Sequence, residues 1–197
     1  GAHLNVSARP LRNSAGEQIG GIGSFFDVSK LQQMTEEAEY FAEHDTLTGL
    51  CNRRAFETRL AQMLASASKD QPVGVIFIDL DRLKLINDTV GHEAGDEAIK
   101  IAGQKLVGAF GEALVARLNG DEFAVLQPGA DEHSLRKLAD EALAEIRKSS
   151  LTLQGHHFAL TASAGGLVVT EPGLAAEQVM GAASGACTDA KGDGRDR

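Results

Sequence analysis

The spacing of apolar residues predicts alternating helices and strands along most of the chain. Apolar side chains recur every three or four residues in the expected helices, and they alternate or run together in the expected strands. The expected helices cover residues 30–44, 54–66, 95–110, 131–148 and 175–191. The expected strands cover residues 3–9, 19–26, 73–80, 114–118, 122–126 and 158–169. This order predicts an α+β fold, with helices on one or both faces of a mainly antiparallel sheet.

The N-terminal segment is expected to be two strands joined by a turn at residues 13–16. Two strands do not form an independent domain, so we interpret residues 1–29 as the end of something larger. Their pattern resembles the last hairpin of a PAS sensor domain; the alternative is a hairpin packed on the main domain. Residues 30–44 would then form a linker helix. One side of this helix carries a short row of apolar residues, Leu31, Met34, Ala38 and Phe41. This seam is compatible with simple packing or with pairing to a second copy of the helix.

Composition excludes several classes of protein. The 197 residues are 43% hydrophobic and 24% charged, which is ordinary for a globular domain. The net charge of −9 argues against a nucleic-acid-binding surface. No apolar run is long enough to span a membrane, so we expect no membrane contact by this segment and a cytoplasmic location. Cys51 and Cys187 lie far apart and are expected to be reduced thiols.

Two groups of acidic residues carry the candidate chemistry. Asp79 and Asp81 end an apolar strand, and the alternation of a strand places both carboxylates on one side. A carboxylate at the end of a buried strand is costly unless it is paired or bound to a metal. The alternative is a helix cap or a surface turn.

The second group follows Asn119-Gly120, a pair that predicts a type I′ hairpin turn. The turn would lift Asp121 and Glu122 onto its rim. If the hairpin lies beside the strand of Asp79, the carboxylates converge, and converging carboxylates suit Mg²⁺. The alternative is a polar tip with solvated acids.

Between the two groups, residues 84–96 are expected to form a shaped loop before a helix, because two glycines and an Asn-Asp pair interrupt the pattern. Taken alone, Asp96 is a helix cap or a first-turn acid, and His92 is a surface histidine.

Four linked motifs identify the chain as similar to the GGDEF family of diguanylate cyclases over residues 45–197. They are Asp45-x-Leu-Thr-Gly-Leu-x-Asn-Arg-Arg54, Asp79-Leu-Asp-x-x-Lys84-x-x-Asn87-Asp, Gly91-His-x-x-Gly-Asp96 and Arg117-x-x-Gly-Asp-Glu-Phe123. The resemblance implies a ferredoxin-like core shared with nucleotide cyclases. It also implies that two GTP molecules are condensed into cyclic di-GMP with release of pyrophosphate, by a homodimer holding one GTP per subunit.

The resemblance implies roles for matching positions. Asp79, Asp121 and the backbone carbonyl of Leu80 would hold Mg²⁺ or Mn²⁺, and Glu122 would be a ligand or electrostatic support. The signature turn beside the nucleotide would be Asn119 and Gly120.

The remaining roles concern GTP. Asn87 and Asp96 would read guanine, whose N1–H and N2–H donors suit a carboxylate acceptor. Phosphates would be contacted by Lys84, Lys191 and Arg195, of which the last two are four apart and would share one face of the final helix.

The chain also departs from the family. The first glycine of the signature is Asn119, which tolerates the left-handed conformation that the turn demands, and Thr188 stands where the family has tyrosine. Three hypotheses follow. The chain is an active cyclase, or a degenerate GTP-binding domain that regulates an adjacent EAL phosphodiesterase domain, or a structural dimerisation module. The retained nucleotide positions argue against the third.

Overall fold

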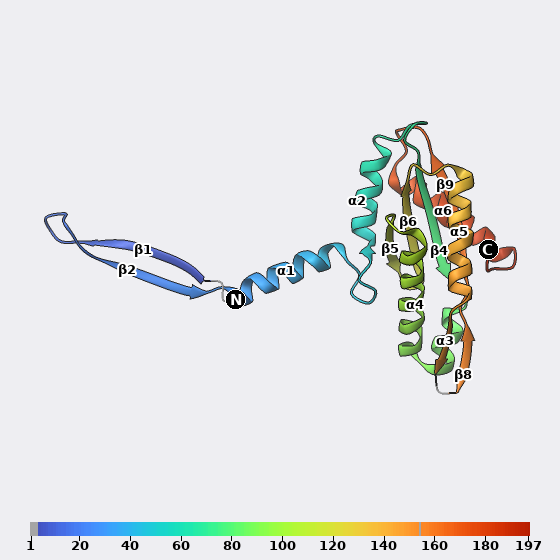
Figure 1. Ribbon diagram of the computed structural model, residues 1–197, viewed down its shortest axis with the longest axis horizontal. Coiled ribbons are helices and arrows are strands. Elements are labelled where there is room, and N and C mark those ends of the chain that lie inside the picture. Colours follow the sequence, from blue (N-terminus) through green and yellow to red (C-terminus); the bar gives the residue numbers. More distant parts are fainter. Residues whose placement is uncertain (1–3, 154) are drawn as a thin grey trace. The chain divides into compact units, whose positions relative to one another are not determined.

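The computed structural model describes residues 4–153 and 155–197 (Figure 1). The chain divides into two compact units, Gly1–Ala42 and Glu43–Arg197. Within the described ranges, no helix combines the length and the apolar character needed to cross a bilayer.

The first unit contains an antiparallel hairpin and a helix, as predicted. Strands β1 (Leu4–Arg12) and β2 (Gln18–Asp27) pair so that Val6 lies opposite Phe25. Both side chains are more than half exposed, at 57% and 68%. Helix α1 (Ser29–Glu43) follows. In the expected seam, the side chain of Leu31 lies outside the described residues, and Met34 is exposed.

The second unit is built on a five-stranded sheet. The strand order is β3 (Cys51–Asn52), β5 (Leu114–Asn119), β6 (Glu122–Pro128), β4 (Val73–Leu80) and β9 (Ala162–Val169). Strand β4 runs antiparallel to both β6 and β9, and β5 runs antiparallel to β6. Only the short β3–β5 pair is parallel among these five strands. The predicted, mainly antiparallel sheet is confirmed.

Helices cover both faces of the sheet (Figure 1). Alternate residues of β4 enter two separate cores, since successive side chains of a strand point to opposite faces. Val75 and Phe77 pack in the core that contains α2 (Arg53–Leu64) and α6 (Ala176–Gly192). Ile76 and Ile78 pack in the other core. Its helices are α3 (Leu83–Val90), α4 (His92–Phe110) and α5 (Glu132–Arg147).

Local sequence explains where two of these helices begin. The Asn52 side chain accepts a hydrogen bond from the N–H of Ala55 at 3.0 Å at the start of α2. Asp131 accepts one from the N–H of Ser134 at 2.7 Å and caps the start of α5. Such caps satisfy backbone donors that a helix leaves without partners.

Two expectations about local structure are wrong. Residues 83–90 form helix α3 rather than a loop. A helix of eight residues is not stable alone, and this one forms because Leu83 and Ile86 are buried in the core. The expected strand over 158–169 is also two strands. Strand β8 (His156–Ala159) pairs with β7 (Ser150–Leu153), and β9 begins only at Ala162. The break occurs because the Thr161 carbonyl turns to accept the N–H of Asp81 at 2.8 Å.

Candidate active site

Three acidic residues meet at one end of the central strands. Asp79, at the end of β4, lies directly opposite Glu122, at the start of β6. The N–H of Leu80 donates to the carbonyl of Asp121 at 3.1 Å, which brings the signature turn beside the end of β4. The hairpin therefore lies beside the strand of Asp79, which is the condition on which the predicted convergence depended, and the charges of Asp121 and Glu122 act on Asp79.

Asp79 is the most constrained of these carboxylates. Its side chain is 17% exposed, and its Oδ1 atom lies 2.5 Å from the ammonium of Lys191. Apart from that ion pair, buried Oδ1 has no hydrogen bond of regular geometry from any described residue. Burial raises the pKa of Asp79; Lys191 opposes the rise, while the charges of Asp121 and Glu122 add to it. The neighbouring acidic charges therefore oppose the ionisation of Asp79.

The donor set fits a hard divalent cation. Carboxylate and carbonyl oxygens are the ligands that Mg²⁺ prefers, and Mg²⁺ commonly takes one or two carboxylates and completes its shell with substrate phosphates and water. The described residues contain no group of three or more His, Cys, Asp or Glu side chains placed to hold a metal ion.

Close packing of α6 against β9 positions Lys191. A side chain at Gly165 would overlap the α6 backbone, with its Cβ 2.6 Å from the Ala183 carbonyl oxygen. The Cys187 thiol donates to the Ser163 carbonyl at 3.2 Å. Burial, together with nearby Asp79, raises the pKa of Cys187 to about 11, so this thiol stays protonated. Both cysteines are free, as expected.

Arg195 does not share a helix face with Lys191, so that expectation is wrong. Helix α6 ends at Gly192, and Arg195 lies beyond it with φ of +64°. Gly194, with φ of +119°, favours this departure, because glycine adopts conformations that a helix does not use.

The signature turn also differs from the expected type I′ geometry. Asn119 is the last residue of β5 and pairs with Glu122, and the register shifts between Arg117 and Asn119. Positive φ occurs at Gly120 (+41°) and not at Asn119. The irregular register lets the turn close without the left-handed conformation at Asn119 that a type I′ turn would need. Asn119 in place of glycine therefore adds no backbone strain.

The other predicted nucleotide residues lie on α3 and α4. Asn87 is on α3, and its buried Oδ1 has no hydrogen-bond partner among the described residues. A side chain at Gly95 of α4 would overlap this amide, so Gly95 allows Asn87 its place. Lys84 and Asp96 are exposed. Asp96 lies past the first turn of α4, where Glu93 is the acidic residue, so it is neither a cap nor a first-turn acid.

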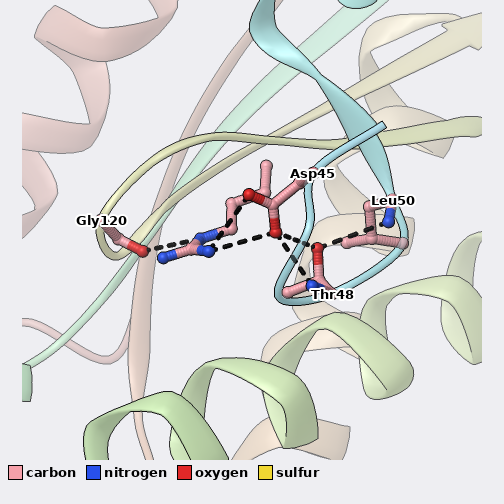
Figure 2. A network of polar contacts seen from close by, with 5 residues as sticks. Asp45, Thr48, Leu50 and Gly120 are labelled. Carbon is pink, nitrogen blue, oxygen red and sulfur yellow. Dashed lines mark hydrogen bonds and ion pairs between the residues drawn. The ribbon is translucent and has the colours of Figure 1, made fainter. Parts of the chain in front are cut away.

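A second polar network joins the start of this unit to the signature turn (Figure 2). Nη1 of Arg117 donates to Oδ1 and Oδ2 of Asp45 at 3.1 and 3.2 Å, and its Nε donates to the Gly120 carbonyl at 3.0 Å. Asp45 also accepts from the N–H and the hydroxyl of Thr48 at 2.9 and 2.7 Å. Both carboxylate oxygens are thus satisfied by the protein.

This network affects the charge state of Asp45. Burial alone would raise the pKa of Asp45, but hydrogen bonds from Thr48 and Arg117, with the Arg117 charge, hold it below its ordinary value. Both residues belong to motifs in the sequence, but no role was predicted for either. They lie 72 positions apart, so only the fold shows the contact.

Comparison with known proteins shows the family of the chain. The family model described as "Diguanylate cyclase, GGDEF domain" matches residues 42–197. The chain belongs to this family. The matched range covers the whole of the second unit, and the expected α+β fold is confirmed.

Relatives include the probable diguanylate cyclase DgcE of Escherichia coli, 34% identical over 98% of this chain and 18% of its own length. The cyclic di-GMP phosphodiesterase NbdA of Pseudomonas aeruginosa is 31% identical over 85% of this chain and 22% of its own length. The chain thus spans about a fifth of these relatives. Among solved structures, the coiled coil and GGDEF domain of DgcB from Caulobacter crescentus, in complex with c-di-GMP, has a TM-score of 0.78. Its identity is 28%, with 86% of this chain and 91% of that chain covered.

Asp81 of the GGDEF domain shares the side of Asp79 predicted by alternation, but it is held differently. Asp81 is 7% exposed. Its carboxylate accepts hydrogen bonds from the hydroxyls of Ser163 and Thr161, each at 2.9 Å. These bonds explain how a buried carboxylate is tolerated there without a metal.

Proposed function

We propose that this chain is the catalytic part of a diguanylate cyclase, which condenses two GTP into cyclic di-GMP. In each of two steps, a 3′-oxygen forms a bond to the α-phosphorus of the other nucleotide. The bond from that phosphorus to the bridging oxygen breaks, and pyrophosphate leaves. The observation that carries the proposal is the placement of Asp79 beside the signature turn, where its buried Oδ1 has Lys191 as its partner among the described residues.

Asp79, Asp121 and the Leu80 carbonyl would hold Mg²⁺ or Mn²⁺, with Glu122 beside them. When bound, the metal would neutralise the triphosphate and polarise the attacking hydroxyl. Lys191 now compensates the charge of Asp79. We infer that with nucleotide bound its ammonium contacts phosphate, where Lys84 and Arg195 add positive charge.

Asn87 and Asp96 would recognise guanine. The unpartnered Oδ1 of Asn87 supports this role, because a buried amide oxygen without a donor costs free energy unless a ligand supplies one. Guanine presents N–H donors on the edge where adenine presents an acceptor, so Asp96 would disfavour ATP.

Each subunit would hold one GTP, so the product requires two active sites face to face, as in a two-fold homodimer. We propose that residues 30–44 link the GGDEF domain, residues 45–197, to the end of a PAS-like sensor at residues 1–29. The exposed apolar pair Val6 and Phe25 supports a hairpin that belongs to a larger domain.

A second function is a GTP-binding domain with little turnover that regulates an EAL phosphodiesterase domain. Its support is the 31% identity to the phosphodiesterase NbdA and the Asn119 substitution in the signature. This function requires nucleotide binding without appreciable product.

The deciding experiment incubates the purified chain with GTP and Mg²⁺ and separates cyclic di-GMP and pyrophosphate by chromatography. We expect product from the native chain and none from Asp121→Asn. Asp70→Asn is the matched control, since Asp70 is exposed and precedes the opposite end of β4. GTP binding without product would favour the regulatory function, and absence of both binding and product would exclude both functions.

A further inference from the structure

The segment that follows α6, residues 193–197, is called the C-terminal strap here. The backbone N–H of Asp196 donates to Oδ2 of Asp81 at 3.2 Å. Arg147 of α5 donates to the Asp196 carboxylate at 2.7 Å and to its carbonyl at 3.2 Å. The carbonyl of Arg197 accepts the N–H of Ala164 in β9 at 2.8 Å. Three elements of the domain therefore hold the strap.

The strap completes the end of α6. The N–H of Asp193 donates to the Asp189 carbonyl at 2.9 Å, and the N–H of Arg195 donates to the Ala190 carbonyl at 3.1 Å. The last carbonyls of a helix have no partners within the helix, so such bonds decide whether its last turn stays formed. Lys191 lies in that last turn.

The strap also adopts a backbone conformation that would not persist alone. Arg195 and Asp196 both have positive φ, at +64° and +56°. This conformation is unfavourable for residues that carry a side chain, and such residues remain in it only where surrounding contacts require it. Here the surrounding contacts are those from Asp81 and Arg147.

We propose that Asp81 is a positioning residue, which anchors the C-terminal strap and thereby holds Lys191 of α6 against Asp79. The inference rests on the proposed function for its catalytic consequence. Asp81 touches neither metal nor nucleotide in this role, because its carboxylate already accepts three hydrogen bonds from the protein. It acts through the strap on the group that compensates the site's charge.

The test compares Asp81→Ala with Asp81→Asn in the full chain. Asparagine keeps one acceptor for Thr161 and Asp196, and its NH₂ group can donate to the Ser163 hydroxyl, which rotates freely. Amide hydrogen exchange is measured at residues 190–196, and the affinity for Mg²⁺-GTP is measured by calorimetry. We expect at least about tenfold faster exchange in Asp81→Ala only, with affinity and turnover reduced about 10- to 100-fold, as for other outer-shell partners.

A double-mutant cycle with Lys191→Ala separates positioning from general destabilisation. If Asp81 acts through Lys191, Asp81→Ala causes no further loss of Mg²⁺-GTP affinity in the Lys191→Ala background. Arg147→Met releases the strap by another route and serves if Asp81→Ala fails to fold. Unchanged exchange at residues 190–196 in the folded variant, or fully additive losses of affinity, would overturn the proposal. Exchange needs no nucleotide, so a chain that makes no cyclic di-GMP would refute the proposed function and leave this test intact.

Discussion

Two carboxylates in this domain have opposite surroundings. Asp45 accepts hydrogen bonds from Thr48 and Arg117 on both oxygens, and its pKa lies below the ordinary value. Asp79 pairs with Lys191 and has two acidic neighbours, its buried Oδ1 has no regular hydrogen bond from the described residues, and its pKa is raised. The Asp45 network is complete within the protein, whereas the Asp79 site carries charge that favours a cation. Among the acidic residues of the family's motifs, the hydrogen-bond donors that each receives thus separate a structural role from a role toward a ligand.

The largest expected difference between the two sites concerns turnover. Asp79→Asn should lower cyclic di-GMP formation about a thousandfold, because charge stabilisation by a bound metal contributes several kcal/mol. Its free energy of unfolding should change less than that of Asp45→Asn, because Asp79→Asn removes repulsion with Asp121 and Glu122. The rate of cyclic di-GMP formation and urea unfolding, measured for both variants, test these two expectations. Equal destabilisation by both would break the comparison.

Gly165→Ala tests whether α6 must approach β9 closely around Asp79. The new methyl group would overlap the α6 backbone, so the free energy of unfolding should fall by about 1–3 kcal/mol or more. Gly185→Ala in α6 is the control, because open space surrounds that position. This substitution should raise the free energy of unfolding by up to about 1 kcal/mol. Thermal or urea unfolding measures both, and a neutral Gly165→Ala would show that α6 can move away without cost.

Asp45→Asn tests the completed network. Loss of the charge weakens the hydrogen bonds from Arg117 and Thr48, and the expected cost is about 1–3 kcal/mol. Urea unfolding at pH 7 measures this cost. Arg53→Ala is a useful control, since Arg53 is half exposed and its contact with Glu122 is 4.0 Å. An equal effect of both variants would mean that the Asp45 network contributes no more than a surface pair.

The pH dependence is expected to be the smallest effect, and its sign differs between the two carboxylates. The folded-state pKa of Asp45 is lowered, so its contribution is present above the unfolded pKa of about 4 and is lost as the pH falls further. The folded-state pKa of Asp79 is raised, so its ionisation costs stability and acid relieves that cost. The difference in unfolding free energy between native chain and Asp45→Asn should therefore shrink below pH 4; growth there would contradict the assignment.

Several site features depended on contacts between distant parts of the chain. The pairing of Asp45 with Arg117 and the anchoring of Asp196 by Asp81 join residues 72 and 115 positions apart. Helix α3 forms because its apolar side chains are buried. Arg195 lies beyond the last helix, which ends at Gly192, although helical spacing alone predicted that it shares a face with Lys191. Local sequence patterns do not predict contacts between such distant residues.

The sequence by itself determined the order of the long helices and strands and the mainly antiparallel sheet. The meeting of Asp79 with the signature turn stayed conditional on the hairpin lying beside the strand of Asp79. Periodicity and strand ends are local properties, and a hairpin brings its own residues together. Only the tertiary structure decided which of the two carboxylates has its hydrogen bonds completed by the protein. Those of Asp45 are complete, whereas Oδ1 of Asp79 has no regular hydrogen bond from the described residues. Lys191 is the cation that the fold itself places against Asp79. The physical reason is that a carboxylate's behaviour depends on burial and on its donors, and both come from segments far away in the chain.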